Sequence, residues 1–106
     1  MHISFGSRKL GKVFEQERLL NRDYGIERAK TIRKLMSYLA SQPNLGIFES
    51  EPLKSFTGFH SLKGNRNGQF AMTVTANYRL TIEANGTFPS LDCVDSITII
   101  GVEDYH

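Results

Sequence analysis

The chain has 106 residues, 40% of them hydrophobic, and 13 Lys and Arg residues against 11 Asp and Glu residues give a formal net charge of +2. This length and composition exclude a disordered chain and predict a single domain over residues 1–106. The lone Cys93 excludes an internal disulfide and is expected to be a buried thiol, and the absence of an 18-residue apolar run excludes a transmembrane helix.

The first half of the sequence predicts a short strand followed by two helices. Residues 1–5 alternate in polarity as a strand does. Ser7 is suited to cap a helix whose apolar stripe ends near Tyr24. A second stripe over residues 26–39 ends before Pro43. We expect these two helices to form an antiparallel hairpin with a shared apolar side.

The second half changes from a helical period to a period of two, which is typical of strands. This alternation predicts strands over residues 70–75 and 78–83, and an apolar run predicts a further strand over residues 96–102. The last of them is apolar on both faces, as an interior strand would be. The segments 43–59 and 87–95 contain the three prolines and are expected to be loops. The predicted fold class is therefore α+β, with two N-terminal helices packed on a small, mainly antiparallel β-sheet.

The small net charge hides an uneven distribution. Residues 54–79 carry four cations and no carboxylate, whereas residues 80–106 carry five carboxylates and no cation. A cationic stretch of this kind either attracts phosphate or is simply a solvated surface. Strand alternation places Arg79 on the face opposite Leu80, so Arg79 either binds a ligand on an open sheet face or only keeps that face soluble.

The most polar part of the chain is the glycine-punctuated segment 60–68. Within it, Lys63 supplies a mobile point charge and Arg66 supplies a planar fork suited to phosphate, although a charged surface turn has the same composition. Two histidines, His60 and His106, flank the strand region in sequence. Imidazole groups move protons at neutral pH, so chemistry permits an acid–base pair here, but spacing alone does not show one.

No cofactor or metal is expected from the sequence. The one cysteine and three histidines lack the paired spacing of a zinc site, and neither a Walker A loop nor a dinucleotide fingerprint is present. Cleavage of a phosphodiester without metal uses the 2′-hydroxyl of RNA as the nucleophile, and it requires acid–base groups and cations.

Two segments carry a recognisable pattern, one in the middle of the chain and one at its end. The first is Leu62-Lys63-Gly64-Asn65-Arg66-Asn67-Gly68-Gln69-Phe70, continued by Ala76-Asn77-Tyr78-Arg79-Leu80. The second is Glu103-Asp104-Tyr105-His106. Together they resemble the L-K-G-D-R-x-G-x-W, N-W/Y-R-I/L and E-D-Y-H motifs of the HigB-type toxins, which are plasmid-maintenance killer proteins of the RelE/ParE superfamily.

The resemblance implies a cytoplasmic, ribosome-dependent endoribonuclease that cleaves mRNA in the decoding site, contacts no membrane and is neutralised by a HigA-like helix-turn-helix antitoxin. The catalytic residues that it implies are His60, Asp104, Tyr105 and His106. The RNA-binding residues that it implies are Lys63, Arg66, Asn77 and Arg79. Asp104 would orient a histidine and Tyr105 would stack on a base. Which group is the general base and which the general acid stays open.

The chain departs from the family pattern in two ways. Asn65, Phe70 and Tyr78 replace the more usual Asp and Trp, and the segments 41–57 and 87–95 are longer than usual. Two other functions share the expected fold: a ParE-like inhibitor that binds DNA gyrase without RNA chemistry, and a relic that binds only an antitoxin. The Lys63-to-Arg66 run and the C-terminal motif favour the nuclease.

Overall fold

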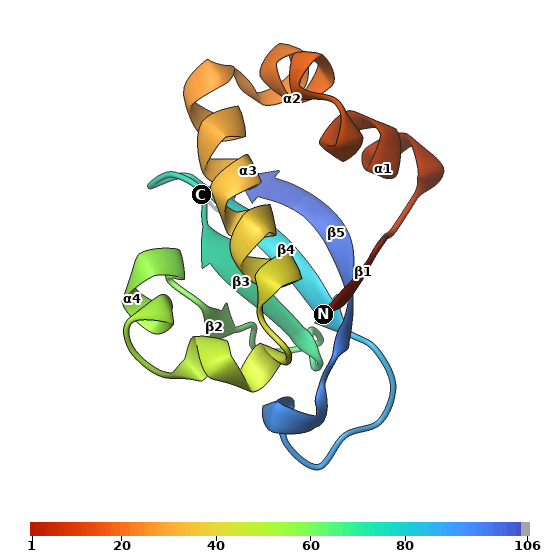
Figure 1. Ribbon diagram of the computed structural model, residues 1–106, viewed down its shortest axis with the longest axis vertical. Coiled ribbons are helices and arrows are strands. Elements are labelled where there is room, and N and C mark those ends of the chain that lie inside the picture. Colours follow the sequence, from red (N-terminus) through yellow and green to blue (C-terminus); the bar gives the residue numbers. More distant parts are fainter. Residues whose placement is uncertain (105–106) are drawn as a thin grey trace.

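The computed structural model describes residues 1–104 (Figure 1). Tyr105 and His106 lie outside the described residues. Within the described range the chain forms β1 (His2–Phe5), α1 (Arg8–Glu15), α2 (Glu17–Tyr24), α3 (Ile26–Ser41), the 3-10 helix η1 (Leu45–Glu49), α4 (Leu53–Thr57), β2 (His60–Ser61), β3 (Gln69–Thr73), β4 (Tyr78–Ala84), the 3-10 helix η2 (Leu91–Cys93) and β5 (Ser96–Asp104).

The strands form one sheet in the order β1-β5-β4-β3-β2. β1 runs parallel to β5, and the other neighbouring pairs are antiparallel. The α+β class and the mainly antiparallel sheet are thus confirmed. β5 lies between two partners, as its apolar character predicted. β2 is a two-residue edge strand that the sequence did not predict, and it pairs His60 with Ala71 and Ser61 with Phe70.

The N-terminal helical region is built from three helices, so the prediction of one helix ending near Tyr24 is wrong. The chain extends at Gln16 (φ −123°, ψ 117°) between α1 and α2. The break lets the two helices meet different partners: the Phe14 ring on α1 lies 5.5 Å from the Phe5 ring of β1, while the fully buried Leu20 on α2 faces the core. The predicted cap is confirmed, because Ser7 accepts a hydrogen bond from Leu10 N–H. None of the helices within residues 1–104 has the length and apolarity needed to cross a bilayer.

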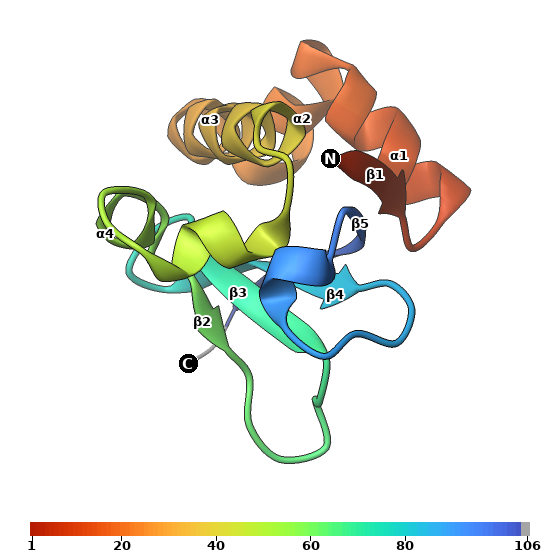
Figure 2. The same cartoon turned by 60° about the horizontal axis from the view of Figure 1, so that its bottom comes forward.

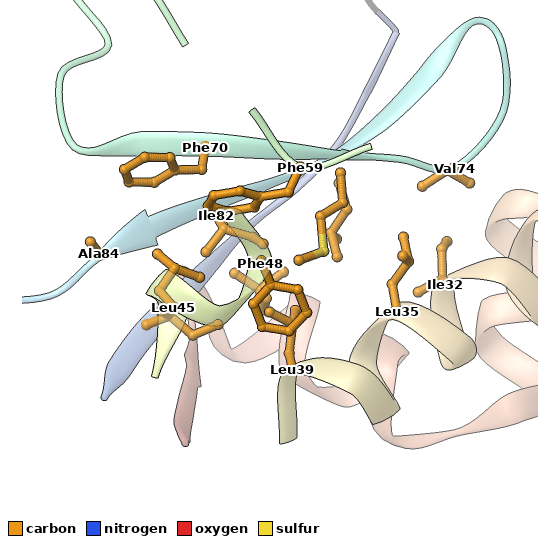
Figure 3. Close-up of a cluster of buried hydrophobic side chains, with 14 of the residues drawn as sticks. Ile32, Leu35, Leu39, Leu45, Phe48, Phe59, Phe70, Val74, Ile82 and Ala84 are labelled. Carbon is orange, nitrogen blue, oxygen red and sulfur yellow. The ribbon is translucent and has the colours of Figure 1, made fainter. Parts of the chain in front are cut away.

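The hydrophobic core lies between the sheet and the helices (Figure 3). Leu35 and Leu39 of α3 face Ile82 of β4 across this core, and all three are at most 2% exposed. Leu45 and Phe48 complete it. These two residues lie in the segment 43–59, whose prediction as a loop is wrong. The segment folds into η1 and α4, because burying its apolar side chains stabilises the chain.

The expectation of a buried cysteine is also wrong, because Cys93 is exposed. Cys93 ends η2, in which its N–H donates to the Ser90 carbonyl at 3.1 Å. The next residue, Val94, is 1% exposed and takes the inward position. A 3-10 turn cannot point both neighbours inward, so the thiol faces outward.

One residue in β5 has no partner in the ladder. Thr81 of β4 faces Gly101, but the next residue, Ile82, faces Ile99, so Ile100 is an extra residue. Such a β-bulge reverses the alternation of faces along the strand. Ile99 therefore points into the core, and Glu103 points to the opposite side of the sheet. Figure 2 shows that the helices cover only one side, and we call the other side the open face.

Candidate functional site

The open face brings together two predicted site residues, His60 of β2 and Arg79 of β4, with Glu103 of β5. In an antiparallel ladder, directly opposed residues project to the same side. Four residues form one row across the sheet, because His60 is paired with Ala71, Ala71 with Thr81, and Thr81 with Gly101. Arg79 faces Glu103 in the adjacent row. His60 lies two strand spacings, roughly 10 Å, from the strand that carries Arg79.

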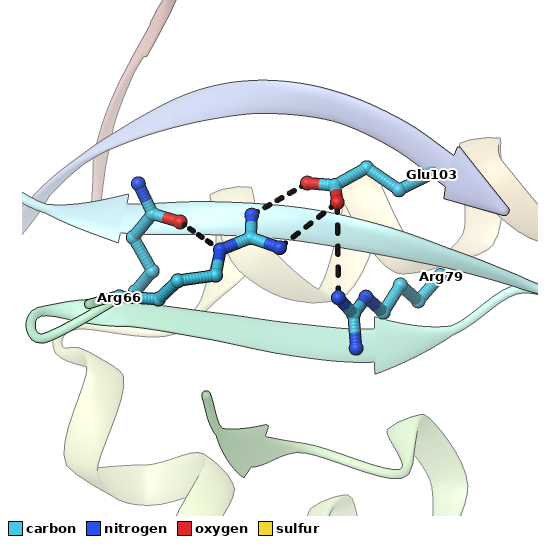
Figure 4. A network of polar contacts seen from close by, with 4 residues as sticks. Arg66, Arg79 and Glu103 are labelled. Atoms are coloured by element: carbon cyan, nitrogen blue, oxygen red, sulfur yellow. Dashed lines mark hydrogen bonds and ion pairs between the residues drawn. The ribbon is translucent and has the colours of Figure 1, made fainter. Parts of the chain in front are cut away.

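A carboxylate joins two arginines on this face (Figure 4). Arg66 donates from Nη1 to Glu103 Oε2 at 3.0 Å and from Nη2 to Glu103 Oε1 at 2.6 Å. Its Nε donates to Gln69 Oε1 at 2.8 Å, which fixes the plane of the guanidinium. Arg79 Nη2 lies 3.7 Å from Glu103 Oε2. The network ties the segment before β3 to the end of β5 and carries a net charge of +1.

The network is partly shielded from water. The Arg79 side chain is 19% exposed, those of Arg66 and Glu103 are each 32% exposed, and Thr81 is completely buried. The hydrogen bonds from Arg66 lower the pKa of the Glu103 carboxyl from 4.5 to about 2, against the opposing effect of burial. Glu103 is therefore ionised at any physiological pH, and the pKa of Arg66 is raised in turn by the same bonds.

Arg66 retains the capacity to hold a phosphate. Each terminal nitrogen of Arg66 has a second N–H beyond the one that it donates to Glu103. The Glu103 carboxylate fixes the position of two flexible cations before any ligand arrives, so less conformational entropy is lost when a phosphate binds. The arrangement thus resembles a prepared anion site more than a free cationic surface.

His60 has a defined hydrogen bond at the edge of the same face. Its Nδ1 lies 2.9 Å from the carbonyl oxygen of Gly58. A carbonyl oxygen can only accept, so Nδ1 carries the proton, and Nε2 of the neutral ring is left to accept one. Gly58 has φ 65°, and a Cβ there would overlap Thr73, so the turn that presents its carbonyl requires glycine.

The other predicted site residues lie around this face. Lys63 is exposed in the connection between β2 and β3, and Asn77 is exposed in the β3–β4 hairpin turn. Asp104 pairs with Tyr78 one position beyond Glu103, so it belongs to the alternate side at the end of β5. Tyr105 and His106 lie outside the described residues. The structure therefore gathers His60, Arg66 and Arg79 on one face, with Lys63 and Asn77 at its margins.

Glu103 is the residue whose role sequence reasoning missed. In the sequence it stands only as part of the C-terminal motif, next to the residues assigned to proton transfer. The charge pattern contained one signal. The cations of residues 54–79 and the carboxylates of residues 80–106 have no opposite charge within their own segment, so ion pairs between the two segments are expected. The register of β4 against β5 then selects which acid meets Arg79.

Comparisons with known proteins agree with the fold. No protein-family model matches the chain, and the search of curated proteins finds no relative. Among solved structures, a YoeB/ParE toxin from Agrobacterium tumefaciens superimposes with a TM-score of 0.60 and 14% sequence identity, over 100% of both chains. The chain therefore shares the fold of this YoeB/ParE toxin.

Proposed function

We propose that the protein is the toxin of a type II toxin-antitoxin system and that it cleaves mRNA on the ribosome in the cytoplasm. The observation that carries this proposal is the open face, where a histidine with an available Nε2 shares one sheet surface with two prearranged arginines. The likeness of the whole chain to a YoeB/ParE toxin supports the toxin part. Its partner would be a HigA-like helix-turn-helix antitoxin encoded next to it.

The proposed chemistry uses the 2′-hydroxyl of the RNA. His60 Nε2 takes the proton of this hydroxyl, and the 2′-oxygen forms a bond to phosphorus. The bond from phosphorus to the 5′-oxygen breaks, and His106 gives that leaving oxygen a proton. The products are a 2′,3′-cyclic phosphate and a 5′-hydroxyl end. Asp104 orients the acid and Tyr105 stacks on a displaced base.

The cations act on the charge that develops at phosphorus. As the 2′-oxygen attacks, negative charge builds on the non-bridging oxygens of the phosphate. Arg66 would bind these oxygens with the N–H groups that Glu103 leaves available, and the positive charge of Arg79 would add to the attraction. Lys63 and Asn77, exposed at the margins, would contact neighbouring phosphate, ribose or base.

The proposal predicts new 5′ ends in ribosome-bound mRNA after induction of the protein. Sequencing of 5′-hydroxyl ends from polysomes, compared with uninduced cells, is the measurement. Intact mRNA accompanied by DNA damage or altered supercoiling would contradict the proposal and indicate the gyrase inhibitor instead. Intact mRNA and DNA, with an antitoxin still bound, would indicate the relic.

Lys63→Ala is expected to reduce the salt dependence of RNA binding. An exposed lysine that contacts one phosphate of single-stranded RNA contributes roughly 0.7 to the slope of log affinity against log salt concentration. Titration of a fluorescent single-stranded RNA at several salt concentrations gives this slope. Lys30→Ala, which removes an exposed lysine from α3 on the helical side, is the matched control. Equal slopes in the two variants would show that Lys63 does not contact the RNA.

A further inference from the structure

The two segments that are longer than usual for the resembled family meet in the structure. η1 and η2 lie side by side in both views of the fold (Figures 1 and 2). Leu45 N–H donates to the Val94 carbonyl at 2.9 Å. The contact is so close that a Cβ at Gly46 would overlap the carboxylate of Asp92. The two insertions thus pack together as one unit beside the sheet.

Between this unit and β2 lies a cavity of about 290 Å³. Phe59 and Phe70 form its apolar part, with ring centroids 5.3 Å apart and planes 11° from parallel. Leu91 of η2 also lines it. This volume is near the lower limit of small-molecule sites, so the cavity is suited to one small group.

The rim of the cavity offers hydrogen bonds of both kinds. Glu49 at the end of η1 presents a carboxylate that accepts, and Lys54 on α4 presents an ammonium that donates. Ser61 on β2 does both. An unpaired nucleobase combines a flat apolar ring with donors and acceptors at its edge, and proteins recognise such bases by this combination of aromatic contact and edge hydrogen bonds.

The cavity adjoins the candidate site at the edge strand. His60 belongs to the lining of the cavity, while its ladder partner Ala71 lies on the open face. β2 is the last strand of the sheet, so a single RNA strand can pass around its edge from the open face to the cavity.

We propose that this cavity binds one unpaired base of the RNA next to the cleaved bond and thereby sets the sequence preference of cleavage. The identity of the occupant as RNA rests on the proposed function. The base-binding property of the cavity is independent of it and is tested separately.

The first test is an NMR titration of the full chain with each of the four nucleoside 5′-monophosphates and with ribose 5-phosphate. We expect at least one nucleotide to shift the amide signals of Glu49, Lys54 and Phe59, and ribose 5-phosphate to leave them in place. Leu91→Trp, which fills the cavity, should abolish the shifts, whereas the control Leu19→Trp on α2 should keep them. Equal shifts with ribose 5-phosphate, or none with any nucleotide, would overturn the proposal.

The second test compares cleavage sites. Glu49→Gln changes one rim group of the cavity without changing its volume, and Glu15→Gln on α1 is its matched control. We expect Glu49→Gln to change the preference for one base at one position by about tenfold, as a single base-reading contact does. An unchanged cleavage pattern in an active Glu49→Gln and an active Leu91→Trp would refute the specificity role. Nucleotide binding without any RNA cleavage would instead refute the proposed function alone.

Discussion

His60→Ala is expected to slow mRNA cleavage by about 10²- to 10⁴-fold, which is the usual contribution of a general acid or base. The side chain is exposed, and its Nδ1 is hydrogen-bonded to the Gly58 carbonyl. The substitution therefore removes the proton acceptor at Nε2 while the fold stays intact. Single-turnover cleavage of mRNA on purified ribosomes gives the rate, and urea unfolding checks the fold.

The matched control is His2→Ala, which removes another exposed histidine from the far edge strand β1. Its cleavage rate should equal that of the unchanged protein. His106→Ala should lose as much activity as His60→Ala and should still bind the antitoxin. Full toxicity of either the His60 or the His106 variant would show that its histidine takes no part in proton transfer.

Glu103→Gln is expected to lower the free energy of unfolding at pH 7 by about 1–2 kcal/mol. The shift of the Glu103 pKa from 4.5 to about 2 corresponds to a larger energy, but the side chain is 32% exposed and solvent screens part of it. The variant also leaves Arg66 and Arg79 close together without the carboxylate between them. Urea unfolding of both proteins measures the difference.

The difference in the free energy of unfolding between the two proteins should decrease in acid. The pKa of Glu103 is lower in the folded chain than in the unfolded chain, so its stabilisation is fully present above pH 4.5. The stabilisation is lost as the pH falls from 4.5 towards about 2, where both states become protonated. The two stability curves should therefore converge in acid.

Glu83→Gln is the control for this prediction, because it removes a carboxylate from the neighbouring strand β4, where Glu83 faces Gln69 and Thr98 instead of the arginines. Its effect at pH 7 should be smaller than that of Glu103→Gln. If the difference in the free energy of unfolding between the unchanged protein and Glu103→Gln stays constant from pH 7 to pH 3, the ion pairs do not hold the network together.

The sequence predicted the elements whose signals are local. The alternation that marks β3 and β4 arises because each strand buries one face on the helices, and the apolar run of β5 marks a strand in the interior of the sheet. The cap at Ser7 depends on a residue three positions away. The break at Gln16 has no glycine or proline to announce it, and it follows from packing against β1, which is a tertiary effect. β2 is too short to show any period.

The candidate site was predicted only in part for the same reason. The family resemblance implied His60, Arg66 and Arg79 as site residues, and the structure places all three on the open face. The contact between Arg66 and Glu103 joins residues 37 positions apart, and no local pattern encodes it. The cavity between η1, β2 and η2 likewise depends on how two distant insertions pack.

Because of the bulge at Ile100, the site depends on the number of residues in β5 as well as on their identity. Ile97, Ile99 and Glu103 all stand at odd positions, yet the isoleucines enter the core and the carboxylate meets two arginines on the other side. A chain shortened by this one uncharged residue would keep every letter of both motifs and would turn Glu103 towards the core. Spacing within β5 is therefore as much a part of the site as the charged residues themselves.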